Sequence, residues 1–158
     1  MLLPAVLSLG GCHLSPVYAG GNASAPATLL ADISIAPIPE RAGFMVRQAL
    51  EEQFGNSVAS PRYRLEIALD DQITAFGVRG DSSAARERRT LRARYRLVDA
   101  ATGTVLVDET AAADAGIDRV SSNFAVVAAE TTALERLSID IARQISARLA
   151  RYARAAKG

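Results

Sequence analysis

The chain has 158 residues, and its 18 lysine and arginine residues nearly balance its 17 aspartate and glutamate residues. This length suits a single domain, and the near-neutral charge argues against a nucleic-acid binder, because such proteins usually carry a strongly basic domain. One histidine and one cysteine exclude most zinc sites and imidazole-activated nucleophiles, so we expect no metal, no other cofactor and no enzyme activity unless carboxylates carry it.

Residues 1–11 form a short apolar segment that ends in two glycines, which is typical of the end of an export signal. The positive region that normally opens such a signal is missing, so we expect the true start to lie upstream of Met1. The sequence Leu9-Gly10-Gly11-Cys12 resembles the bacterial lipobox, in which the signal is cut before a lipid-modified cysteine. We therefore predict lipid attachment at Cys12. The alternative is that Cys12 is an ordinary small residue of a signal peptide.

The segment after Cys12 predicts a flexible tether between lipid and protein. No apolar run reaches the ~18–20 residues that a membrane-spanning helix needs. Two or more lipid chains hold a protein stably on a membrane, and a fully acylated cysteine would carry enough of them. Residues 12–28 include a small, polar stretch from Gly20 to Thr28 and are expected to be the tether. Residues 29–158 are expected to form one domain.

The first elements of that domain are a strand and a helix. Isoleucines at period two predict a strand within residues 29–38, which two prolines end because proline cannot donate to a strand ladder. Pro39 and Glu40 then suit the start of a helix. Apolar residues recur at helical spacing from Ala42 to Phe54, where Gly55 ends the pattern.

Three further strands follow. Apolar and polar residues alternate over residues 63–70 and again over residues 91–97, which predicts strands with one buried and one solvated face. Residues 99–103 favour a hairpin turn that leads into a partner strand over residues 104–114. Residues 76–85 are either a mobile loop or a rim.

A long amphipathic helix ends the chain. Ser121 or Ser122 suits the N-cap position, and apolar residues recur at spacings of three and four from Phe124 to Tyr152. The expected order β-α-β-β-β-α predicts an α+β two-layer sandwich, with a four-stranded, mostly antiparallel sheet and two helices on one face.

Six arginines fall between residues 86 and 96, and those at positions 92, 94 and 96 share one face of a regular strand. Guanidinium groups pair with phosphate through two parallel hydrogen bonds, so the row could bind phosphorylated glycolipid or an acidic protein surface. The alternative is a solvated sheet face that acids such as Glu66 and Asp70 neutralise, or edge charges that prevent association. The candidate contact residues are Arg88, Arg89, Arg92, Arg94 and Arg96.

The paired acids Asp70 and Asp71 are a weaker candidate site. Neighbouring residues on a strand point to opposite faces, whereas a carboxylate pair for hydrolysis must face one substrate. We interpret them as acids at a strand end. A periplasmic hydrolase stays as a hypothesis that requires two acidic side chains on one pocket. His13 lies beside the proposed lipid anchor, where a catalytic role is not expected.

Short motifs along the mature chain carry a family resemblance. They are Gly11-Cys12 with Pro16-Val17-Tyr18, Glu40-Arg41-Ala42-Gly43 with Arg47 and Leu50, Pro61-Arg62-Tyr63-Arg64-Leu65, Tyr95-Arg96-Leu97, Asp99 with Thr102-Gly103, Val105-Leu106, Phe124-Ala125, Ala128-Ala129-Glu130 and Ala133. In this order and spacing the chain resembles the LptE family of lipopolysaccharide-assembly lipoproteins, especially its alphaproteobacterial branch. His13 and Leu14 depart from the family, which often has glycine and an aromatic residue there.

The resemblance implies a lipid-anchored protein on the periplasmic side of the outer membrane. It implies that the protein partners the LptD β-barrel as a plug and assembly factor, and that it helps to insert lipopolysaccharide into the outer leaflet. Neither nucleic acid nor an enzyme substrate is implied. The alternative is an auxiliary lipoprotein of a lipid-trafficking ABC transport system. Depletion separates these hypotheses, because the first predicts loss of surface lipopolysaccharide and the second predicts altered phospholipid or solvent tolerance.

Overall fold

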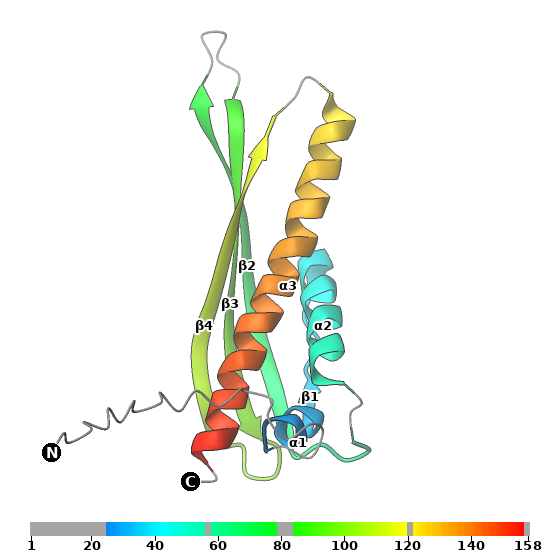
Figure 1. Ribbon diagram of the computed structural model, residues 1–158, viewed down its shortest axis with the longest axis vertical. Helices are drawn as coiled ribbons and strands as arrows, with labels where there is room; N and C mark the ends of the chain where they lie inside the picture. Colours follow the sequence, from blue (N-terminus) through cyan, green and yellow to red (C-terminus); the bar gives the residue numbers. More distant parts are fainter. Residues whose placement is uncertain (1–24, 56–57, 79–83, 120–121, 157–158) are drawn as a thin grey trace, which may run out of the picture.

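Helices and strands combine into an α+β fold in the computed structural model, which describes residues 25–55, 58–78, 84–119 and 122–156 (Figure 1). The predicted fold class is confirmed. Within these ranges no helix has both the length and the apolar character needed to cross a membrane. The elements are α1 (Ala25–Ala31), β1 (Ile33–Ile35), α2 (Glu40–Phe54), β2 (Tyr63–Val78), β3 (Ala84–Asp99), β4 (Val105–Asp118) and α3 (Asn123–Ala155).

The strands lie in the order β1-β2-β3-β4, so chain neighbours are also neighbours in the sheet. The short β1 pairs parallel with the start of β2, and α2 makes the crossover between them. The pairs β2–β3 and β3–β4 are antiparallel, with Glu66 opposite Arg96 and Arg96 opposite Asp108. The sheet is therefore mostly antiparallel, as the alternating patterns predict.

The two faces of the sheet differ in what covers them. Helix α3 packs against α2, β3 and β4, and Figure 1 shows both long helices on the same side of the sheet. In β3 the side chains of Leu91 and Leu97 are completely buried under this layer, whereas Arg92 and Arg94 between them are exposed. We call the two faces the covered face and the open face. The open face presents the even-numbered residues from Arg64 to Phe76 in β2, from Arg86 to Arg96 in β3 and from Asp108 to Asp118 in β4.

Helix α2 matches the predicted helix at both ends. Pro39 precedes it in an extended conformation, and Gly55 ends it with a φ of 74°, a value that glycine adopts without steric cost. Ala42, Val46 and Leu50 form the buried stripe. Gly43 is required by a close approach, because a Cβ atom there would lie 2.6 Å from the carbonyl oxygen of Ile38.

Helix α3 contributes the longest part of the core. Ser122 caps it, since its hydroxyl oxygen accepts a hydrogen bond from the amide of Ala125 at 3.4 Å. Its 33 residues span about 50 Å at ~1.5 Å per residue, enough to cross the whole sheet. Ile141, Ile145 and Leu149 are fully buried against the sheet and α2, and each contributes about 1.5–3 kcal/mol through burial.

Predicted boundaries are wrong in two regions of the chain. The strand expected within residues 29–38 is only β1, because Leu29 and Leu30 belong to α1, which packs against α3. Helix α1 begins at Ala25, inside the range expected for the tether. Strands β2 and β3 are also much longer than expected, so the described parts of residues 76–85 continue these strands. Tertiary packing overrides local pattern in both places.

Strand β4 lies at the edge of the sheet, with β3 as its only partner in the strand order. A side chain from α3 reaches this edge, because Gln144 Nε2 donates a hydrogen bond to the carbonyl oxygen of Ala112 at 3.1 Å. The carbonyl of Ala112 therefore has a partner even though no strand of the described residues lies beyond β4.

Candidate functional site: the arginines of the open face

Strand β3 places its arginines by simple alternation. Arg92, Arg94 and Arg96 share the open face, as predicted from their spacing, and Arg88 lies on the same side. Arg89 has the opposite parity and lies on the covered face. The structure thus brings four of the five candidate arginines onto one surface and separates the fifth from them.

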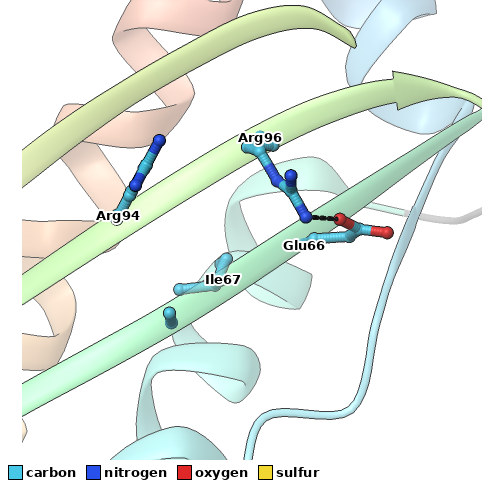
Figure 2. A pocket seen from close by; sticks show the side chains of 5 residues that line it. Glu66, Ile67, Arg94 and Arg96 are labelled. Carbon is cyan, nitrogen blue, oxygen red and sulfur yellow. Dashed lines mark hydrogen bonds and ion pairs between the residues drawn. The ribbon is translucent and has the colours of Figure 1, made fainter. Parts of the chain in front are cut away.

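Arg96 belongs to a three-residue ion-pair network with β2. Its Nη2 donates to Glu66 Oε2 at 2.7 Å (Figure 2). Arg64 Nη2 lies 2.9 Å from Glu66 Oε1, so two arginines share one carboxylate. The hydrogen bond from Arg64, with the nearby charge of Arg96, holds the pKa of the Glu66 carboxyl below its usual range. Glu66 is therefore ionised at neutral pH and neutralises part of the row.

Arg94 forms an ion pair with the other neighbouring strand, β4. Its Nε and Nη2 donate to the two carboxylate oxygens of Asp108 at 3.1 Å and 2.9 Å, which is the bidentate geometry of a strong ion pair. These hydrogen bonds lower the pKa of Asp108 and raise the pKa of Arg94. The Arg94 side chain is nevertheless 69% exposed, so solvent screens this pair and its groups can exchange partners.

Arg88 and Arg92 are held less firmly. Arg88 lies over the ring of Phe76, with its guanidinium carbon 5.6 Å from the ring centre, and its nearest acid, Asp114, is 3.8 Å away. Arg92 forms no ion pair with any residue that the structure describes. It lies opposite Asp70 in the register, but Asp70 accepts hydrogen bonds from Gln72 Nε2 instead. Arg92 is thus the candidate arginine best placed to bind an external anion.

A shallow hollow of about 410 Å³ opens between these side chains. Figure 2 shows Arg94 and Arg96 projecting from β3 beside Glu66 and Ile67 of β2. Ala68, opposite Arg94 in the register, completes the lining, and its small side chain leaves room beside the longer arginine. The hollow presents guanidinium groups to anything that lies against the open face.

Arg89 has a different environment from its neighbours. Its Nε and Nη2 donate to Asp71 of β2 at 2.8 Å and 2.5 Å, and its Nη1 donates to the carbonyl oxygen of Glu130 in α3 at 2.8 Å. The hydrogen bonds that Arg89 donates to Asp71 raise the pKa of Arg89. Both side chains are mostly buried, so the pair does not present Arg89 to a partner, and the hydrogen bond to Glu130 joins the sheet to α3.

The acids Asp70 and Asp71 point to opposite faces, as their adjacency predicts, but the expected position at a strand end is wrong. Both lie within β2, opposite Arg92 and Leu91. Two acids do share one hollow elsewhere, since Glu52 and Glu135 both line a groove between α2 and α3. A pair of acids on one hollow is the arrangement that the hydrolase hypothesis requires.

Cys12, the predicted lipid-attachment residue, lies outside the described residues. Within the described ranges, no group of three or more histidine, cysteine, aspartate or glutamate side chains is placed to hold a metal ion.

The sequence reasoning missed Arg64 and Asp108 as residues of the candidate site. Both have the strand parity of the open face and could have been recognised from it.

Comparison with known proteins identifies a family that this chain matches. The model of the family described as "LptE: Lipopolysaccharide-assembly" matches residues 30–149. A search of curated proteins found no match.

Solved structures share the fold. A lipoprotein from Caulobacter crescentus is 25% identical, with a TM-score of 0.69 over 82% of this chain and 96% of that chain. Lipoprotein B from Nitrosomonas europaea is 14% identical, with a TM-score of 0.61 over 78% of this chain and 84% of that chain. A minor lipoprotein from Acinetobacter baumannii is 13% identical, with a TM-score of 0.59 over 75% and 90%. The last two similarities concern the fold alone.

Proposed function

We propose that this chain, which belongs to the LptE family of lipopolysaccharide-assembly proteins, partners an LptD-type outer-membrane β-barrel as its plug and assembly factor and helps to insert lipopolysaccharide into the outer leaflet. The observation that carries this proposal is the family match over residues 30–149, which includes nearly all of the folded domain. That match favours lipopolysaccharide assembly over an auxiliary subunit of a lipid-trafficking ABC system. It also argues against a hydrolase, because the family is generally one of non-enzymatic assembly lipoproteins.

The proposed anchor is a lipid on Cys12, which would hold the domain at the periplasmic side of the outer membrane. The sequence Leu9-Gly10-Gly11-Cys12 supports this attachment, and the similar folds in three lipoproteins agree with it. Mass spectrometry of the N-terminal peptide from membrane-extracted protein tests it. We expect a peptide that begins at an acylated Cys12, whereas an unmodified N-terminus would contradict the anchor.

The open face is the proposed contact surface for lipopolysaccharide or the barrel. Arginine and acid side chains alternate across it, so its charge is nearly balanced before any partner arrives. Exposed ion pairs are worth only ~0–1 kcal/mol, so exchanging a carboxylate for a phosphate costs little and gains a more highly charged partner. Arg92 needs no such exchange. These properties support a surface that binds phosphate groups reversibly rather than one that holds them permanently.

Affinity purification of the tagged chain from solubilised outer membranes tests the partnership. We expect the LptD-type barrel to co-purify, and depletion of the chain should remove lipopolysaccharide from the cell surface. Recovery of ABC-transport components without the barrel, or loss of solvent tolerance with normal surface lipopolysaccharide, would support the alternative.

A triple charge reversal at Arg92, Arg94 and Arg96 tests the surface. Each is replaced by glutamate, and binding to the barrel and to lipopolysaccharide is compared with the melting temperature. We expect binding to fall much more than stability, because the three side chains are exposed. Reversal of the exposed arginines Arg136 and Arg143 of α3 is the matched control. A loss of stability without a loss of binding would show that the row is structural.

A further inference from the structure

A groove on the helical layer has features that the open face lacks. It has a volume of about 300 Å³ and lies between α2 and α3, on the side of the molecule opposite the open face. Its lining residues are Phe44, Met45, Gln48, Ala49, Glu52, Glu135, Ser138 and Ile139.

Apolar side chains form much of the wall and remain in contact with solvent. Phe44 is 67% exposed and Ile139 is 40% exposed, although each sits on a helix whose other residues supply the core. Phe44 also borders a second hollow, with Arg47 and Glu51, so its ring stands between two depressions. A ring this exposed offers apolar surface to a partner.

Three polar groups of the groove have no partner among the residues that the structure describes. Glu52 and Glu135 form no ion pair with any described residue, whereas most acids on the open face are paired with arginine. Ser138 lines the same groove, is only 1% exposed, and its hydroxyl oxygen has no hydrogen-bond partner among the described residues. A buried hydroxyl without a partner is uncommon, and a ligand that reached the floor of the groove would supply one.

We propose that the groove binds an arginine side chain presented by a segment of a partner protein, with aliphatic residues on either side of that arginine. The methylene stem would lie against Phe44 and Ile139, and the guanidinium would lie between Glu52 and Glu135. Its planar face suits the exposed ring of Phe44 through a cation–π contact, and one of its N–H groups can donate to the Ser138 hydroxyl. Because this surface lies across the molecule from the open face, the inference goes beyond the proposed function and does not depend on it.

A pair of blocked tripeptides tests the groove by NMR titration of the purified full chain. The first peptide is leucyl-arginyl-leucine amide, and the second replaces arginine with citrulline, which has nearly the same shape but no charge. We expect the arginine peptide to shift the amide signals of Phe44, Ser138 and Ile139, and the citrulline peptide to bind roughly tenfold more weakly.

Variants of the chain sharpen the test. The double change Glu52→Gln and Glu135→Gln should weaken the arginine peptide roughly tenfold, and Phe44→Ala should weaken both peptides. Asp114→Asn on the open face is the matched control and should leave binding unchanged. All variants should keep the melting temperature of the unmodified chain, because the altered side chains are exposed.

Three results would overturn the inference. They are equal binding of the two peptides, shifts confined to the open face, and no shift in the groove with peptide at up to about 10 mM. If the groove signals instead move with protein concentration when no peptide is present, the occupant is a second copy of this chain, and the proposal of a separate partner is wrong.

Discussion

Two arginines of the same strand show how the covered and open faces differ. Arg89 and Arg94 each bind both oxygens of an aspartate on a neighbouring strand, yet the Arg89 side chain is 13% exposed and the Arg94 side chain is 69% exposed. The same bidentate chemistry therefore joins two strands beneath a helix in one place and remains available to a partner in the other. Burial, not the residue type or its pairing, assigns the role.

The largest expected contrast compares neighbours on the two faces. Leu91→Ala should lower the free energy of unfolding by about 3–4 kcal/mol, because Leu91 is completely buried and the change leaves a cavity. Arg92→Ala should change it by no more than about 0.5 kcal/mol, since the side chain is exposed and lacks an ion pair among the described residues. Urea unfolding monitored by circular dichroism measures both. A large loss for the arginine variant would contradict the assignment of the faces.

The next contrast breaks the two arginine pairs. Asp71→Ala should cost about 2–3 kcal/mol, because it leaves the mostly buried Arg89 without its carboxylate. Asp108→Ala removes the partner of Arg94 and should change stability little, because water replaces the lost hydrogen bonds. Urea unfolding monitored by circular dichroism measures the loss of stability in both variants. Similar losses for the two variants would show that exposure does not separate the pairs.

Replacing a glycine by alanine, in the helical layer or on the open face, should have a smaller effect on the free energy of unfolding. Gly43→Ala should cost about 1–3 kcal/mol, because the new Cβ would collide with the backbone of Ile38 at the start of α2. Gly116→Ala on the open face meets no atom within 4 Å and should stabilise the protein by about 0.5–1 kcal/mol. Thermal unfolding of both variants tests the difference in sign. Destabilisation by the Gly116 change would indicate a neighbour that covers this part of β4.

The smallest effect is an acid dependence of the open face. Glu66 and Asp108 have pKa values below their usual range, so the folded state favours their ionised forms. Their contribution to stability is present above the unfolded-state values near pH 4 and is lost as the pH falls through the lower folded-state values. Unfolding measured from pH 6 to pH 2.5 should show this decline, and high salt should reduce it. Asp108→Asn should reduce the dependence of the free energy of unfolding on pH. An unchanged dependence would contradict the pairing of Asp108 with Arg94.

Much of the fold was predictable because its signals are local. Pro39, Glu40 and Gly55 mark the ends of α2 in the sequence, and Ser122 marks the start of α3. The alternation over residues 91–97 predicted both the strand and its two faces. These predictions succeed because caps and periodic burial depend on residues close together in the chain.

The remaining features depend on contacts between distant segments. Helix α1 has seven residues, too few for a stable isolated helix, so its packing on α3 decides its conformation. The second half of β2 lacks a clear alternation of apolar and polar residues. The exposed apolar side chains of Ile73 and Phe76 lie on opposite faces of the sheet there. Arg89 could have been separated from the other candidates by strand parity. Its contact with the carbonyl oxygen of Glu130 could not have been predicted without the placement of α3.

The hydrogen bond from Gln144 to Ala112 has a consequence for how the exposed edge of the sheet meets other proteins. An alanine-rich edge strand such as β4 is a template on which a foreign strand could dock and begin amyloid-like stacking. The amide of Gln144 already occupies the carbonyl that an incoming strand would need, and the charge of Asp114 interrupts the run of alanines. This hydrogen bond and this charge therefore make β4 a poorer template for a further strand.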